Sequence, residues 1–281
     1  MPIVRYARYR EYESQRIVAN DSMMGLLAGA KLAAHTLTLT EGSPHRLPEI
    51  FPNVPHIERF NLQVVAAKYI LDNAEDYLGT LAIPYALAIH EDLVMGMLQM
   101  ANSIGLISNT ALGKLTAATM HEALQNLGGG NLTPESLEIF HLVRLSRNAQ
   151  IHSGGIAGQA LVSAVATTSS AALGVWATIT KQPFPAYKLG DRVSLGLQDL
   201  IGVLAITKRL AEEANAMMQS IYPRPGWADM VVEEWVPTRK PGQNRDQLIR
   251  TVRGFARGHY EALKFTEAEI TAAMQRAKTI P

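Results

Sequence analysis

TPESLEIFHLVRLSRNAQIHSGG, residues 133–155, carries the clearest structural signals in the chain. Thr133 is a favoured N-cap residue, and Pro134 suits the first position of a helix. Glu135 follows in the first turn, where the helix dipole stabilises a negative charge. Two glycines come at the end of the stretch, at positions 154 and 155. The sequence therefore predicts a helix from Thr133 to about Ser153.

This helix changes character halfway along its length. Its first half is apolar, whereas its second half contains Arg144, Ser146, Arg147, Asn148, Gln150 and His152. A buried polar group without a partner costs a few kcal/mol, so this second half either faces water or lines a wet site. A solvated helix end whose basic residues complement the dipole is one interpretation. A functional site is the other.

The rest of the chain also has the composition of a helical protein and residues that typically begin or end helices. Aromatic residues make up only 6% of the chain, which favours helix over sheet. Apolar spacing and cap residues predict further helices over residues 14–38, 57–78, 84–101, 108–127, 156–180 and 194–221. Residues 227–237 are expected to be irregular or β-prone. Two more helices are predicted, over 246–260 and after the capping-box match that begins at Thr266. The expected fold class is all-α.

Prolines suggest where the chain divides. Pro44, Pro48, Pro52 and Pro55 fall within twelve residues, a density that interrupts any helix and stiffens a link. We therefore expect an N-terminal helical arm with a proline-rich connector over 1–56. A helical bundle is expected over 57–222, and a small helical extension over 223–281.

Composition excludes several classes of chemistry. The chain has no cysteine, so it forms no disulfide, uses no thiol nucleophile and has no cysteine-bound metal. It lacks a Walker A sequence, a His-Glu-x-x-His pair and a Gly-x-Ser-x-Gly elbow. Its eight histidines do not cluster by spacing. The sequence therefore predicts neither a cofactor nor a metal site.

The net charge of +1 hides a local excess. Residues 239–281 contain nine basic and four acidic residues, which gives this tail a formal charge of +5. The N-terminus has no apolar run after its first basic residues, so it does not match a secretory signal. The longest apolar stretch, Met23–Leu39, is interrupted by Lys31 and His35 and is short for a bilayer span. These features predict a cytoplasmic protein with no membrane contact.

The spacing Arg147-Asn148-x-x-x-His152 resembles the signature of the HEPN superfamily, and the resemblance covers roughly residues 57–222. It implies a small helical bundle that is usually dimeric and often a metal-independent ribonuclease. By this resemblance His152 would be the general acid or base, Arg147 would hold the scissile phosphate, and Asn148 would orient an oxygen or the partner histidine. The product would be a 2′,3′-cyclic phosphate.

The resemblance implies roles for other residues too. Glu91, on an earlier helix, would pair with Arg147 or fix the tautomer of the histidine, although an ordinary surface glutamate is an alternative. Arg144 would add a phosphate contact, or it is simply solvated.

In the basic tail, Arg250, Arg253 and Arg257 are candidates for RNA binding because of the local charge excess. Trp227 and Trp235 are interpreted as packing residues of the tail, and His141 as a structural histidine.

Helix geometry constrains this site. Five positions on an ideal helix differ by about 140° in azimuth, so Arg147 and His152 do not point at one atom, whereas Asn148 and His152 share a face. The arrangement fits if Arg147 reaches round on its long side chain, if the helix ends near His152, or if the second chain of a homodimer supplies part of the site. We expect a homodimer. The expected function is RNA cleavage by an endoribonuclease that acts as a toxin or a defence effector. A protein antitoxin is expected as a further partner. A non-catalytic interaction protein and a nucleic-acid-binding regulator that uses the basic tail stay open as alternatives.

Overall fold

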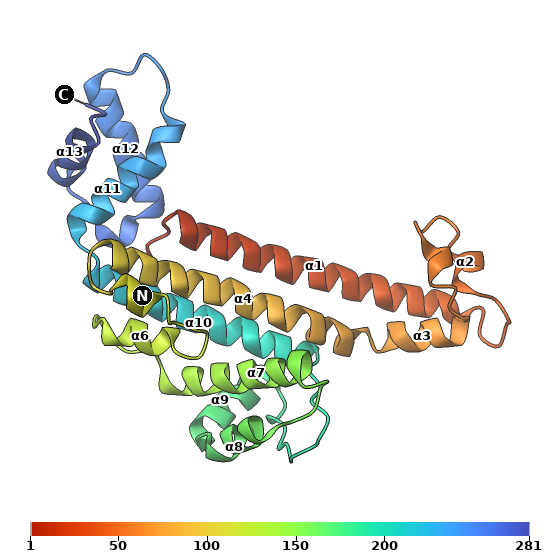
Figure 1. The fold of residues 1–281 in the computed structure, drawn as a ribbon. Helices are drawn as coiled ribbons and strands as arrows, with labels where there is room; N and C mark the ends of the chain where they lie inside the picture. Colours follow the sequence, from red (N-terminus) through yellow and green to blue (C-terminus); the bar gives the residue numbers. More distant parts are fainter. Residues whose placement is uncertain (1, 281) are drawn as a thin grey trace. The chain divides into compact units, whose positions relative to one another are not determined.

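The computed structural model describes residues 2–280, which form thirteen α-helices, three short 3₁₀ helices and no β-strand. The predicted all-α fold class is therefore confirmed (Figure 1). The chain divides into two compact units. Unit 1 comprises residues up to Gln15, Leu87–His141 and the chain from Ala205 onward, and unit 2 comprises Arg16–Ala86 and Leu142–Leu204. The boundaries expected after residues 56 and 222 stay predictions.

Four long helices each contribute one end to each unit. They are α1 (Ala7–Thr38), α4 (Ala74–Ser103), α7 (Pro134–His152) and α10 (Leu197–Ile221). Unit 1 also contains α5 (Asn109–Leu112), α6 (Met120–Asn126), α11 (Arg224–Trp235), η2 (Val236–Thr238), α12 (Arg245–His259), η3 (Glu261–Leu263) and α13 (Glu267–Arg276). Unit 2 adds α2 (Leu47–Ile50), η1 (Ile57–Arg59), α3 (Val64–Asp72), α8 (Gln159–Thr167) and α9 (Ser170–Thr180).

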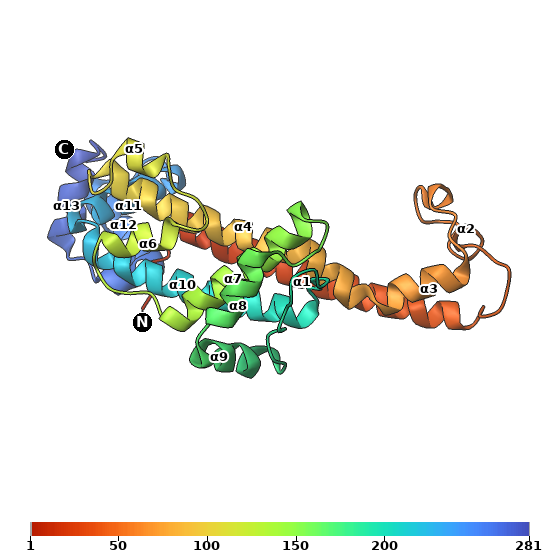
Figure 2. The ribbon, with the colours of Figure 1, turned by 60° about the horizontal axis from the view of Figure 1, so that its bottom comes forward.

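The tail of unit 1 is a group of three helices. Helices α11, α12 and α13 pack against one another, and they lie together in both views (Figures 1 and 2). Trp227 is fully buried, and the centroid of its ring lies 5.0 Å from that of Tyr222 and 5.6 Å from that of Tyr6. Trp235 is 3% exposed. The interpretation of both tryptophans as packing residues is confirmed.

The irregular link expected over 227–237 is wrong, because α11 occupies Arg224–Trp235. Pro223 and Pro225 suggest a stop, but proline also fits the first turn of a helix, and here a new helix begins. Trp227, Val231 and Trp235 then recur at helical spacing and are all buried. This buried face stabilises the helix.

Several predicted helix boundaries are also wrong. Helix α1 begins at Ala7 rather than at Ser14, because Tyr9 and Tyr12 already pack inward at 2% and 3% exposure. Helix α4 begins at Ala74 and continues through Pro84. An internal proline costs about 3 kcal/mol, and the fully buried Ile83 and Leu87 beside it provide compensating burial.

Three of the expected long helices are interrupted. The stretch 57–78 contains η1, α3 and the start of α4, and 108–127 contains only the short α5 and α6. The stretch 156–180 divides into α8 and α9, because the Ser169 side chain accepts a hydrogen bond from Ala172 N (3.1 Å) and begins a new helix. Local apolar spacing predicts these segments as helical but does not show where each helix breaks.

The core of unit 2 near its proline-rich segment is small and apolar. Leu37, Val64 and Ala67 are at most 2% exposed, and partly buried residues of α2 and α3 pack around them. Among the described residues one helix, α4, is long and apolar enough to cross a membrane, but 61% of that stretch is buried by the rest of the chain. Helices α8 and α9, bent by 98° from each other, are together also long and apolar enough.

Candidate functional site

The polar half of α7 ends in a glycine cap. The N–H groups of Ser153 and Gly155 both donate to the carbonyl oxygen of Ala149, at 3.0 and 3.1 Å. Gly154 has a φ of +60°, the left-handed conformation that terminates helices and that glycine adopts without strain. Helix α7 therefore begins at Pro134, as predicted, and ends at His152, one residue before the expected end.

The motif residues lie on this one continuous helix in different environments. Arg147 is half-buried and has an interaction partner, Asn148 is half-buried, and His152 is exposed in the last turn. Since the helix is regular, Asn148 and His152 share a face, whereas Arg147 lies about 140° from His152 around the axis. On one chain the two residues therefore point from different sides of the helix.

The other predicted site residues are distributed over both units. Glu91 lies on the part of α4 in unit 1, where it is half-buried and has a polar interaction. Arg144 lies in unit 2, is half-buried and also has an interaction partner. The roles expected for both residues toward RNA stay predictions.

The three arginines of the tail share one face of α12. Arg250, Arg253 and Arg257 stand at positions i, i+3 and i+7, which lie along one side of a helix. Arg250 and Arg257 are exposed, whereas Arg253 forms an ion pair with Glu267. The helix presents a basic stripe in which two of the three charges face solvent.

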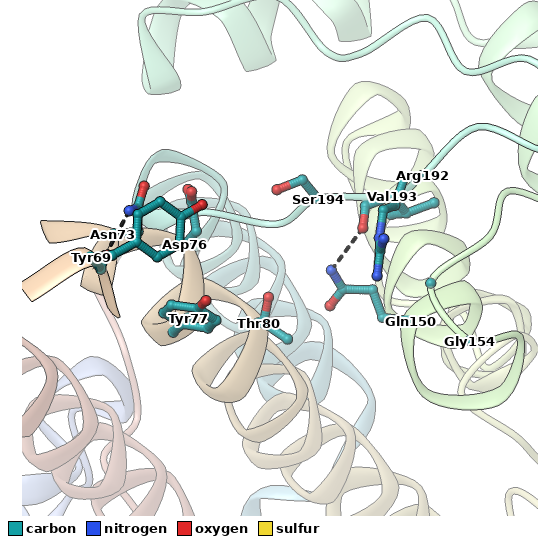
Figure 3. A pocket seen from close by; sticks show the side chains of 11 residues that line it. Tyr69, Asn73, Asp76, Tyr77, Thr80, Gln150, Gly154, Arg192, Val193 and Ser194 are labelled. Atoms are coloured by element: carbon teal, nitrogen blue, oxygen red, sulfur yellow. Dashed lines mark hydrogen bonds between the residues drawn. The ribbon is translucent and has the colours of Figure 1, made fainter. Parts of the chain in front are cut away.

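A polar pocket of about 400 Å³ lies in unit 2 beside the end of α7 (Figure 3). Three segments line it: Tyr69–Thr80 from α3 and α4, Gln150–Gly155 from α7 and its cap, and the loop Arg192–Ser194. Figure 3 shows Asn73 and Asp76 on one side, Gln150 and Arg192 on the other, and Ser194 between them. His152 is not among the lining residues.

Backbone pairing attaches the Arg192 loop to the segment that follows α7. Ile156 and Arg192 form an antiparallel bridge, and Val193 N donates to Gly155 O (2.8 Å). The Gln150 amide donates to the Val193 carbonyl oxygen at 3.1 Å. These bonds place Arg192 on the wall of the pocket. Its exposed guanidinium forms no ion pair within residues 2–280.

The opposite side of this loop rests directly on α4. A Cβ atom on Gly79 would lie 2.4 Å from the carbonyl carbon of Gly196, so only glycine allows this approach. The Thr80 hydroxyl donates to Leu195 O (3.3 Å) beside this contact. In the first turn of α10, directly after the loop, Asp199 is 7% exposed and accepts a hydrogen bond from Gly196 N (2.8 Å). Burial raises the pKa of this carboxyl, although the hydrogen bond acts in the opposite direction.

Sequence reasoning missed this pocket, because its walls lie about 120 positions apart in the chain. Nothing in the spacing of Asp76, Tyr77 and Arg192 connects them. The only local signal was the turn composition of Gly190-Asp191, which predicts a loop but no partner for it. Motif helix and pocket meet only through Gln150 and the glycine cap.

Neither a metal-binding cluster nor a known relative identifies the site. Within residues 2–280, no group of three or more histidine, aspartate or glutamate side chains is placed to hold a metal ion. The groups that the site offers for chemistry are the imidazole, guanidinium, carboxylate, amide and hydroxyl groups described above. No family model matches the sequence, and no curated protein or solved structure is significantly similar to the chain.

Proposed function

We propose that the protein is a metal-independent endoribonuclease of the HEPN type, and that its reacting groups lie on the C-terminal half of α7. The observation that carries the proposal is the position of His152, an exposed imidazole in the last turn of the helix that bears Arg147 and Asn148. An imidazole titrates near neutral pH, which suits proton transfer at a ribose hydroxyl.

The reaction needs one proton acceptor, one proton donor and a stabilising cation. His152 removes the proton of the 2′-hydroxyl, whose oxygen attacks the adjacent phosphorus. The bond from phosphorus to the 5′-oxygen breaks, and that oxygen takes up the proton that His152 removed. Arg147 stabilises the negative charge that develops on the phosphate oxygens. The products are a 2′,3′-cyclic phosphate and a 5′-hydroxyl end.

The helix geometry supports a site built from two chains. Arg147 and His152 diverge by about 140° on one α7, so the guanidinium of one chain acts with the imidazole of a second. Asn148 shares the face of His152 and would orient the phosphate or the partner's ring. The proposed enzyme is therefore a homodimer with composite sites.

Cleavage of RNA in EDTA, with analysis of the product ends, tests the reaction. We expect 2′,3′-cyclic phosphate ends from the wild type and a loss of at least about a hundredfold in rate for His152→Ala. His35→Ala, which changes an exposed histidine of α1, serves as the matched control and keeps the wild-type rate. Absence of cleavage by the wild type, or equal rates for His152→Ala and wild type, contradicts the proposal.

Mixing two inactive variants tests the composite site. Arg147→Gln and His152→Ala chains, each inactive alone, form mixed dimers in which one of the two sites has both reacting groups. Activity should therefore return on mixing. A strict monomer at micromolar concentration in equilibrium sedimentation, or no recovery in a verified mixed dimer, contradicts the two-chain arrangement.

A second function, RNA binding by the tail without catalysis, is supported by the arginine stripe of α12. Arg250 and Arg257 are exposed on the same face, and clustered guanidinium groups bind phosphates in a salt-dependent way. RNA that binds through Arg250 and Arg257 and stays intact favours this function over the nuclease. The Arg250→Gln, Arg257→Gln double variant, with His152 intact, separates the two functions.

A further inference from the structure

The polar pocket of unit 2 presents aromatic rings beside hydrogen-bonding groups. Tyr69 and Tyr77 line it and are 66% and 48% exposed, so a planar ligand has access to them. Exposed aromatic rings in RNA-binding proteins stack against unpaired bases, and each base contributes about 1–3 kcal/mol. A cavity of about 400 Å³ lies in the range of sites for small molecules.

The two sides of the pocket carry opposite charges. Asp76 lies in the first turn of α4, is exposed, and forms no ion pair within residues 2–280. Arg192, on the other side, also has no ion-pair partner there. Figure 3 shows the two side chains apart, with Ser194 between them. The pocket therefore offers a carboxylate at one end and a guanidinium at the other.

This combination selects a ligand with three chemical features. It has a flat ring to stack on a tyrosine, N–H donors for Asp76, and an anionic group for Arg192. A nucleotide combines all three, since its base supplies the ring and the donors and its phosphate supplies the anion. Guanidinium groups bind phosphate with directed, charge-assisted hydrogen bonds.

The carboxylate also distinguishes among the four bases. Guanine carries two adjacent N–H donors on its Watson–Crick edge, which match the two oxygens of a carboxylate. Adenine and cytosine place a ring-nitrogen acceptor beside their amino group, and uracil places carbonyl acceptors beside its single N–H. These acceptors face the carboxylate unfavourably, so the pocket chemistry fits guanine best.

We infer that the pocket formed by Tyr77, Asp76 and Arg192 binds a guanine nucleotide of single-stranded RNA, and this inference rests on the proposed function. Asp76 accepts hydrogen bonds from the base, Tyr77 or Tyr69 stacks on it, and Arg192 binds its phosphate. The pocket is next to the end of α7, so a guanosine bound there fixes the position of the adjoining nucleotides of the RNA. The expected consequence is cleavage or binding biased to a guanosine.

Binding of the four nucleoside 3′-monophosphates, measured by calorimetry on the full-length protein, tests the site. Guanosine 3′-monophosphate should bind at least about tenfold more tightly than the other three, and Asp76→Asn should remove this preference. Arg192→Gln should weaken all four nucleotides about tenfold without changing their order. Asp21→Asn and Arg59→Gln alter exposed residues of unit 2 outside the pocket and should bind as the wild type does.

Far-UV circular dichroism and thermal melting verify that each variant is folded. Equal affinity for all four nucleotides, no binding of any of them, or an unchanged preference in folded Asp76→Asn overturns the inference. RNA cleavage by a protein without nucleotide preference contradicts this pocket assignment and leaves the nuclease proposal intact. Selective binding of guanosine 3′-monophosphate without any RNA cleavage contradicts the nuclease proposal and leaves the pocket assignment intact.

Discussion

The Nε2 atoms of His90 and His121 lie 2.9 Å apart in the interior of unit 1. His90 is 0% exposed and His121 is 1% exposed, and the Phe140 ring packs edge-on against His121 with centroids 4.6 Å apart. One imidazole ring donates its N–H and the other accepts, which requires that at least one imidazole stays neutral. Burial lowers the pKa of His121 to about 3, and His141 adds a smaller effect in the same direction.

This pair predicts a loss of stability in mild acid. An unfolded histidine binds a proton below about pH 6.5, whereas folded His121 stays neutral until about pH 3. Between these values the unfolded state binds more protons, so the free energy of unfolding falls as the pH falls. We expect the urea midpoint to be lower at pH 5 than at pH 7.5. In His121→Gln, whose amide is neutral throughout, this difference should shrink.

A histidine on the surface provides the control for this measurement. His35 is exposed on α1, so His35→Gln should keep the wild-type dependence of the urea midpoint on pH. If His121→Gln and the wild type lose the same stability between pH 7.5 and pH 5, the buried pair is not the cause.

Cap chemistry explains which helices could be predicted from the sequence. Asn244 and Thr266 each form a complete capping box, and the predicted starts of α12 and α13 are within a residue or two of the observed ones. Pro134 likewise begins α7. These signals are local, since the cap and its partner stand within three residues. Where burial by distant segments decides, as for Pro84 inside α4 and for α11, the local signal predicted the wrong boundary.

The candidate site could be predicted only in part, for the same reason. The motif of Arg147 and His152 lies within one helix and can be read from spacing. Arg192 enters the site through a backbone bridge to Ile156, and Asp76 through the close approach of α4. Such pairings depend on tertiary contacts for which the sequence has no short-range signal.

The glycine at position 79 should be necessary for the stability of unit 2. A Cβ there would lie 2.4 Å from Gly196 C and 2.5 Å from Leu195 O, which are backbone atoms that cannot rotate away. Gly79→Ala should therefore lower the free energy of unfolding by about 1–3 kcal/mol, despite the better helix propensity of alanine. Urea denaturation of both proteins measures this difference.

Gly25 provides a matched substitution on α1. A Cβ there would have no atom within 4 Å, so Gly25→Ala should stabilise the protein by about 0.5–1 kcal/mol. If the two alanine variants are equally stable, the contact of α4 with the 195–196 loop does not exclude a side chain at position 79.

The ion pair between Arg224 and Glu269 should stabilise the tail in a pH-dependent way. Two nitrogens of Arg224 bind the two oxygens of Glu269 at 2.7 and 3.1 Å. Arg224 lowers the pKa of Glu269 to about 2, helped by a hydrogen bond from Thr266 N. The stabilisation is therefore complete above about pH 4.5 and is lost as the pH falls toward 2.

The variant Glu269→Gln tests this ion pair. Since both side chains are partly exposed, the loss at pH 6 should be no more than about 1 kcal/mol. The difference between wild type and variant should vanish near pH 2. Glu261→Gln alters an exposed glutamate of the same tail and should have no such effect. A difference between Glu269→Gln and the wild type that is constant from pH 6 to pH 2 argues against the ion pair as its source.

The arginine stripe of α12 predicts how RNA affinity depends on salt. Each arginine that neutralises a phosphate releases counterions, so its removal should lower the slope of log K against log salt concentration by about 0.7 for a single strand. Arg250→Gln and Arg257→Gln should each show this change. Arg253→Gln should change the slope less, because Arg253 is already paired with Glu267. Arg239→Gln, an exposed change outside α12, is the control. If Arg250→Gln and Arg257→Gln both keep the wild-type slope, as the control Arg239→Gln should, RNA does not bind along this face.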